Sequence, residues 1–264
     1  MSEVLSGELK KGELLYEGKA KRAYLIVDHP DWLWLEYKDS LTAFNAQKKG
    51  EFAGKGAINK QVSSLVFRYL EKHRVSTHWV QDIDEGNLIC QRLEMIPLEV
   101  VVRNRLAGST AKKFNRPEGE ALERPLVEFY YKDDALQDPF ISDEQALMLG
   151  TVNKQGQLNR IKLEALKINE CLIKFFSESQ IELIDFKLEF GWNMGAAAKG
   201  MAEDSEALAP LVLGDEISPD SCRLWDQQTG ERMDKDRFRR DLGAVEENYR
   251  EVLKRVQERW EKEL

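Results

Sequence analysis

The sequence predicts an α+β protein with two lobes, a strand-rich N-terminal lobe of residues 1–96 and a larger mixed lobe of residues 97–264. Short apolar and aromatic runs bounded by glycine, proline and aspartate are typical of strands, and they dominate the first lobe. Longer stretches in which apolar residues return every three or four positions predict amphipathic helices in both lobes. A chain of 264 residues is long enough for two lobes that pack closely on each other.

In the N-terminal lobe, two apolar runs flank Gly18 and predict a hairpin. Further on, Ile58, Val62, Leu65, Val66 and Tyr69 recur at helical spacing, which predicts an amphipathic helix over residues 55–72. The ranges predicted as strands are 14–16, 23–27, 32–37, 78–83 and 88–93, the last two joined by a turn at 84–87.

In the C-terminal lobe, Ser142 and Gln145 form a capping-box pattern that predicts the start of a short helix. Apolar stripes predict a long helix from Ile161 to Phe175 and a final helix from Val245 to Trp260, and residues 109–115 predict a short one. The predicted strands are 98–102, 126–131, 181–190 and 211–213.

The composition excludes several classes of protein. A net charge of −8 provides no global basic field for nucleic acid. No apolar run is long enough to span a bilayer, and the first eleven residues lack the apolar core of a signal peptide, so we expect a cytoplasmic protein. The three cysteines lack metal-ligand spacing, which indicates free buried thiols, and the scattered histidines make a zinc site or a histidine-dependent triad improbable.

The tetrapeptide Gly18-Lys19-Ala20-Lys21 lies between two predicted strands. Residues i and i+2 of a strand face the same side, so Lys19 and Lys21 could reach one polyphosphate. Gly18 would allow close approach of the backbone to a ligand. On its own, the tetrapeptide is more often a solvated hairpin tip, because short motifs match by chance.

The segment of residues 97–105 places charged side chains on a strongly apolar strand. Glu99 and Arg103 share one strand face by alternation, and charges are costly in a core, so a pocket wall suits them better. Arg103 and Arg105 suit bidentate binding of carboxylate or phosphate. Backbone amides around Ser109, at the start of a helix, could also bind an anion. The alternative is an edge strand with surface ion pairs.

Residues 183–191 alternate between an apolar face and the charged residues Asp185, Lys187 and Glu189. Such a strand is either a solvated ladder of ion pairs or a nucleotide–metal site, in which carboxylates hold Mg²⁺ and the lysine contacts phosphate. Asp215 ends a later strand, and if that strand pairs with the one bearing Glu189, the two carboxylates can share one cation. Taken alone, Gly214-Asp215-Glu216 is usually a turn, and Lys132 and Asp138 lie in what is usually a polar loop.

Together these segments resemble the SAICAR synthetase family over nearly the whole chain. The collinear blocks are GKAK, PLEVVVRNRLAGS, LIDFKLEFG, LGDEISPDSCRLWD and MDKDRFRRDLG. The resemblance implies an enzyme that uses ATP and Mg²⁺ to join L-aspartate to the carboxylate of carboxyaminoimidazole ribotide. It implies a two-lobed fold with the site in the cleft, and a homodimer.

The resemblance also implies roles for individual residues. It assigns contacts with ATP to Lys19, Lys21, Met95, Lys187 and Glu189, and metal binding to Glu189 and Asp215. It assigns ribotide binding to Glu99, Arg103, Ser109 and Arg223. It places Lys132 and Asp138 near the reacting groups, where Lys19, Lys187 and Arg223 are the other catalytic candidates.

Two departures from the family pattern stand out. The segment of residues 192–210 is longer than the turn at this place in many relatives, and it predicts an extended hairpin loop. Residues 42–45 and Gln137 lie in segments that vary among relatives, and we assign no catalytic role to them.

Two other functions remain open from the residues alone. One is a small-molecule kinase with the same lysines and acids. The other is a non-catalytic nucleotide- or RNA-binding module built on Arg103 and Arg105, against which the acidic composition argues.

Overall fold

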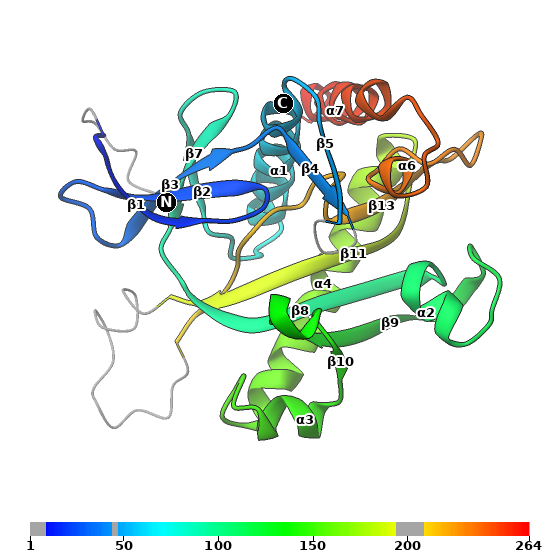
Figure 1. Ribbon diagram of the computed structural model, residues 1–264, viewed down its shortest axis with the longest axis horizontal. Helices are drawn as coiled ribbons and strands as arrows, with labels where there is room; N and C mark the ends of the chain where they lie inside the picture. Colours follow the sequence, from blue (N-terminus) through cyan, green and yellow to red (C-terminus); the bar gives the residue numbers. More distant parts are fainter. Residues whose placement is uncertain (1–8, 44–46, 194–208, 264) are drawn as a thin grey trace.

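The computed structural model describes residues 9–43, 47–193 and 209–263 (Figure 1). It is a mixed α and β structure, as the sequence predicts, and it is built on two main sheets and a small hairpin. Residues 194–208 lie outside the described residues, and with them most of the segment predicted as an extended loop.

The first sheet is antiparallel throughout and comes from the N-terminal part of the chain. In spatial order its strands are β1 (Lys11–Glu17), β2 (Lys21–Ile26), β3 (Trp32–Tyr37), β7 (Asn87–Gln91) and β6 (Trp79–Asp82). The predicted hairpin around Gly18 is confirmed, because β1 pairs with β2 and the Gly18 amide donates to the Lys21 carbonyl at 2.8 Å. A separate pair, β4 (Ser40–Ala43) and β5 (Lys48–Glu51), was not predicted.

The second sheet has β11 (Ile181–Trp192) near its centre. Its order is β10 (Phe140–Ile141), β9 (Ala121–Tyr131), β8 (Glu94–Arg105), β11 and β12 (Leu211–Leu213), and β13 (Cys222–Asp226) also pairs with β11. The predicted strand of residues 98–102 is therefore too short, since β8 runs from Glu94 to Arg105. The predicted lobe boundary between residues 96 and 97 falls inside this continuous strand.

Helices cover the sheets and close the core. They are α1 (Lys55–Lys72), α2 (Gly108–Lys113), α3 (Asp143–Met148), α4 (Gln155–Glu178), α6 (Asp236–Arg239) and α7 (Val245–Glu261), with a 3₁₀ turn at Asp134–Leu136. The capping box at Ser142 and Gln145 is confirmed. Figure 1 shows α4 behind β8, β9 and β11, and α1 beside α7.

The main core joins elements from both predicted lobes. Buried residues of α1, including Val62 and Val66, belong to the same cluster as Leu172 of α4, Phe186 of β11 and Val252 of α7. From Phe186 to Phe190, alternate residues of β11 belong to this cluster, and Asp185, Lys187 and Glu189 lie outside it. The core therefore fixes the strand that carries the predicted charged residues.

Candidate active site

Two adjoining cavities lie where the first hairpin faces the second sheet. We call the first, of about 310 Å³, the arginine pocket, because Arg103, Arg223 and Arg239 line it. We call the second, of about 440 Å³, the lysine pocket, because Lys19, Lys21 and Lys132 line it. The residues common to both linings are Lys19, Thr42, Glu99, Lys187, Asp220, Ser221 and Lys235. The two pockets are thus parts of one cleft.

The β1–β2 hairpin places its two lysines, Lys19 and Lys21, at the lining of the lysine pocket. The ammonium of Lys19 lies 2.6 Å from the Asp134 carboxylate, and that of Lys21 contacts Asp215 and lies 3.0 Å from Glu216. Burial alone would lower the pKa of Lys21, but the carboxylates of Asp215 and Glu216 raise it well above its usual range. Lys21 is therefore a fixed positive charge in the floor of the pocket.

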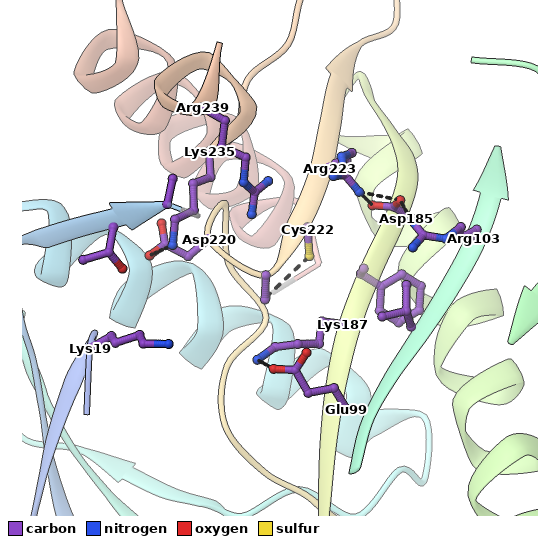
Figure 2. A pocket seen from close by; sticks show the side chains of 15 residues that line it. Lys19, Glu99, Arg103, Asp185, Lys187, Asp220, Cys222, Arg223, Lys235 and Arg239 are labelled. Atoms are coloured by element: carbon purple, nitrogen blue, oxygen red, sulfur yellow. Dashed lines mark hydrogen bonds and ion pairs between the residues drawn. The ribbon is translucent and has the colours of Figure 1, made fainter. Parts of the chain in front are cut away.

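Lys187 of β11 lies among three carboxylates. Its Nζ is 2.8 Å from Glu99 Oε1 and 2.8 Å from Glu189 Oε1, and 4.0 Å from Asp215 Oδ2. Figure 2 shows Lys187 and Glu99 paired on the floor of the arginine pocket, with Lys19 reaching toward them from the hairpin. Burial would lower the pKa of Lys187, but Glu189 and Glu99 raise it well above its usual range.

Glu189 and Asp215 come together as the predicted pairing requires. β11 pairs with β12, Phe190 opposite Leu213, and the Gly214 amide donates to the Glu189 carbonyl at 2.9 Å. The Glu189 carboxylate is nearly buried and contacts the ammonium of Lys132, whereas that of Asp215 contacts Lys21. Burial would raise the pKa of Asp215, but Lys21 and Lys187 hold it below its usual range, so this carboxylate is ionised.

The pair fits a magnesium ion in its chemistry. Both carboxylates face Lys187, and each is now balanced by an ammonium group that a cation could replace. Mg²⁺ takes one or two carboxylates from a protein when phosphate oxygens and water supply the rest. Within the part of the chain that the structure describes, no group of three His, Cys, Asp or Glu side chains forms a metal site.

A network of carboxylates orients the arginines of the arginine pocket. Asp185, almost fully buried, contacts Arg103 and accepts from Arg223 Nη1 at 2.8 and 3.0 Å. Arg103 Nε also donates to Glu128 at 2.7 Å, and Arg223 Nε donates to Asp236 at 2.9 Å. In both guanidinium groups the donors to these carboxylates are Nε and Nη1, and Arg103 Nη2 also donates to the Tyr130 hydroxyl at 3.3 Å. These contacts fix the planes of both groups beside the cavity (Figure 2).

Gly108 is required by this arrangement. Its φ of +59° lies in the left-handed region, and a Cβ built on it would lie 2.5 Å from Arg223 Nη2. The glycine of the predicted anion-binding segment therefore makes room for an arginine. Ser109 beside it is exposed on α2, and among the described residues it is not part of either pocket lining.

Of the other predicted site residues, some line a pocket and one does not. Glu99 lines both pockets, Lys132 and Asp138 line the lysine pocket, and the Asp138 carboxylate accepts from the Asp133 amide at 3.0 Å. Met95 is half-exposed, pairs with Gly191 across the sheet, and does not contribute to the described lining of either pocket.

Sequence reasoning missed several residues that line the cleft. Thr42 was given no role, yet it lines both pockets, as do Asp220, Ser221 and Lys235. Arg239 lines the arginine pocket. Lys235 and Arg239 are four residues apart at α6, a spacing that puts two side chains on one helix face, and this spacing is visible in the sequence.

The cysteines take no part in ion pairing. Cys90, Cys171 and Cys222 are free, as predicted, but Cys171 is only partly buried. Burial raises the pKa of the Cys222 thiol far above its usual range, so Cys222 lines the arginine pocket as a neutral group. In the described residues, no helix is long and apolar enough to span a membrane.

A cleft that combines fixed cations with a pair of carboxylates is typical of enzymes that act on small anionic molecules. Comparison with known proteins gives the family. The family model described as SAICAR synthetase matches residues 14–256. This chain belongs to the SAICAR synthetase family, and it is a ligase.

The relatives match along almost their whole length. The phosphoribosylaminoimidazole-succinocarboxamide synthase of Wolinella succinogenes is 49% identical over 248 residues, which are 94% of this chain and 99% of the relative. The synthase of the same name from Desulfitobacterium hafniense is 49% identical over 95% of this chain and 98% of its own length.

Solved structures agree with the fold. The crystal structure of the synthase from Ehrlichia chaffeensis superposes with a TM-score of 0.85 at 39% identity, covering 93% of this chain and 98% of its own. A SAICAR synthetase solved in complex with ADP superposes with a TM-score of 0.82 at 43% identity, covering 92% of this chain and 97% of its own. The predicted family and α+β fold are therefore confirmed.

Proposed function

We propose that this protein joins L-aspartate to the carboxylate of carboxyaminoimidazole ribotide at the expense of ATP, releasing ADP and phosphate. The observation that carries the proposal is the single cleft with two pockets, one walled by arginines and the other by lysines and a carboxylate pair. Lys187 and Lys235 line both, so cations stand where the contents of the two pockets would meet. The complex of a relative with ADP supports a nucleotide site.

The chemistry requires activation of the ribotide carboxylate. An amine does not displace hydroxide or oxide from a carboxylate at neutral pH. In the first step a carboxylate oxygen attacks the γ-phosphorus of ATP, the bond from phosphorus to the ADP oxygen breaks, and an acyl phosphate forms. In the second step the aspartate amine attacks the acyl carbon, the bond to phosphate breaks, and the nitrogen loses a proton. No protein nucleophile is needed.

The residues of the cleft supply positioning and charge. Arg103 and Arg223 would contact the ribotide phosphate, because their carboxylate partners already fix the planes of their guanidinium groups. Lys19 and Lys21 would bind the triphosphate, and Lys187 would offset the charge that builds up between the carboxylate and the γ-phosphate. Lys235 adds positive charge where the two pockets meet, and Arg239 adds it in the arginine pocket.

Glu189 and Asp215 would hold the magnesium ion. The ion would supply Lewis-acid polarisation of the phosphate oxygens. The roles of Glu99, Lys132, Asp138, Ser109 and Met95 follow the family resemblance and form part of the proposal. So do the homodimer and the cytoplasmic location.

The test separates a ligase from a kinase. ADP release is measured with the ribotide and ATP–Mg²⁺, with and without aspartate, while the imidazole product is followed by chromatography. A ligase gives steady ADP release and the succinocarboxamide product only when aspartate is present. Steady turnover without aspartate, with a stable phosphorylated ribotide as product, would establish a kinase and refute the proposal.

A further inference from the structure

A buried lysine begins helix α1, where a cation is electrostatically unfavourable. Lys55 is the first residue of the helix and is 1% exposed, and the first turn contains no acidic residue. The amino end of a helix carries partial positive charge, and an isolated buried ammonium is strongly destabilising. A lysine in this place therefore needs a compensating anion.

The compensating anion is Asp220, which also contacts the cleft. Lys55 Nζ lies 2.7 Å from Asp220 Oδ2, and the hydroxyl of Tyr249 on α7 donates to Asp220 Oδ1 at 2.8 Å. The same Oδ2 lies 3.5 Å from Lys235 Nζ. One nearly buried carboxylate thus joins the start of α1, the final helix and a lysine that lines both pockets.

Lys235 is held at two points. Its backbone amide donates to the carbonyl of Pro219, next to Asp220, at 3.1 Å, and its ammonium faces the Asp220 carboxylate. Figure 2 shows Lys235 and Asp220 close together on the side of the pocket opposite Arg103 and Arg223. Two lysines share this one carboxylate, which leaves a net positive charge directed at the cleft.

We propose that Lys55 and Tyr249 are positioning residues, which fix Asp220 so that Asp220 holds the ammonium of Lys235 where an anionic group of the substrates binds. A lysine side chain has four rotatable bonds and loses considerable entropy when it is ordered. Ordering it before the substrate arrives removes that cost from binding. This inference rests on the proposed function, since it concerns the substrates of the same cleft.

Two variants remove the support without touching the cleft. Tyr249→Phe deletes only the hydroxyl that donates to Asp220, and Lys55→Met removes the charge and keeps the length of the side chain. The chain offers a matched control for each. In Tyr69→Phe the lost hydroxyl is buried without a hydrogen-bond partner among the described residues, and in Lys60→Met the lost ammonium is buried on the same helix and pairs with Asp82 at 2.9 Å.

The experiment is a double-mutant cycle with Lys235→Met. Dissociation constants for the ribotide, ATP and aspartate are measured by calorimetry, which does not depend on turnover. The ligand whose dissociation constant Lys235→Met raises most is identified, and that dissociation constant is then compared across all the variants. In the wild-type background we expect Tyr249→Phe and Lys55→Met to raise this dissociation constant roughly 3- to 10-fold, the size of a typical hydrogen-bond loss, because the effect reaches the substrate only through Lys235. In the Lys235→Met background we expect less than about 1.5-fold.

Other outcomes would overturn the inference. Equal effects in both backgrounds would show that Tyr249 and Lys55 act on overall stability alone, and so would effects no larger than those of Tyr69→Phe and Lys60→Met. An unchanged set of constants in Lys235→Met would also overturn it. Failure of the proposed function is separate, because it would appear as a wild-type protein that forms no succinocarboxamide product.

Discussion

Asp185→Asn tests whether the arginine pocket is held in shape by its carboxylates. The substitution keeps the shape of the side chain and removes the charge that Arg103 and Arg223 share. The exposed fractions of these side chains are 4% for Asp185, 4% for Arg103 and 18% for Arg223, so solvent replaces little of the lost interaction. Both the stability of the protein and its affinity for the ribotide should therefore fall.

The expected loss of stability in Asp185→Asn depends on the ion pairs that the two arginines keep. Removing one partner of a buried ion pair costs about 3–5 kcal/mol. Arg103 keeps Glu128 and Arg223 keeps Asp236, so we expect the lower end, about 3 kcal/mol. At roughly 2–4 °C per kcal/mol for a chain of this size, the Tm should fall by about 6–12 °C.

The assay is thermal unfolding followed by circular dichroism, with Asp143→Asn as the control. Asp143 pairs with Lys162 at 2.7 Å near the surface, away from the cleft, and such a pair contributes at most about 1 kcal/mol. A Tm loss in Asp185→Asn no greater than that in Asp143→Asn would refute the view that this carboxylate organises the pocket. Added ribotide should narrow the difference between Asp185→Asn and wild type, since its phosphate supplies an anion to the same arginines.

Three more predictions concern the metal pair, a glycine and a buried acid. Glu189→Ala and Asp215→Ala should each abolish Mg²⁺-dependent turnover and leave the fold intact by circular dichroism; normal turnover in both would remove the metal assignment. Gly108→Ala should raise the KM for the ribotide at least about 10-fold and leave the KM for ATP within about 2-fold. The reason is that the new Cβ would displace Arg223 from its two carboxylates, Asp185 and Asp236. Equal changes in the two KM values would contradict this prediction. Burial raises the pKa of Asp234 to about 7, so between about pH 4 and about pH 7 the folded protein binds a proton that the unfolded chain has lost. The contribution of Asp234 to the free energy of unfolding is complete below about pH 4 and falls by up to about 4 kcal/mol as the pH rises through 7. Asp234→Asn should therefore reduce the fall in Tm between about pH 5 and about pH 8. If the Tm of the variant depends on pH as that of the wild type does, Asp234 is not the source of the fall.

Helical periodicity and short apolar runs predicted several elements with accurate bounds. The strand of residues 32–37, the helix of residues 55–72 and the strand of residues 211–213 were predicted with the bounds they have in the structure. The helix was predicted from the spacing of its apolar residues and the two strands from short apolar runs, and these apolar residues are mostly buried or half-buried. Local patterns are reliable where the apolar residues are the ones that become buried.

Two elements with short sequence patterns, the strand β13 and the hairpin of β4 and β5, were not predicted. Strand β13 has only five residues, and its two buried positions, Cys222 and Leu224, are too few for the alternation to stand out in the sequence. The hairpin of β4 and β5 has four-residue strands, and a contact from outside it, Lys48 Nζ to the Phe238 carbonyl at 2.5 Å, helps to hold it. Nothing in the local sequence signals such tertiary contacts.

The site residues also divide into those that a local pattern reveals and those that depend on tertiary contacts. Residues inside long charged strand motifs, such as Glu99, Arg103 and Lys187, could be found because their positions are costly in an ordinary core. Asp220 and Thr42 could not, because a turn aspartate and a strand threonine are common on surfaces. Their importance comes from distant partners, Lys55 and Tyr249 in the case of Asp220.

The pairing of charges in the lysine pocket explains why nucleotide and metal should bind together. Each of two cations that could bind phosphate is now balanced by a carboxylate: Lys21 by Asp215, and Lys132 by Glu189. A triphosphate that took over these ammonium groups would leave two ionised carboxylates facing its own negative charge. A divalent cation between them removes that repulsion, so the affinities for ATP and for Mg²⁺ should each rise in the presence of the other, by the same factor. Neutralising the acid in Glu189→Gln would weaken this coupling in both directions, which calorimetric titration of ATP at several Mg²⁺ concentrations can measure.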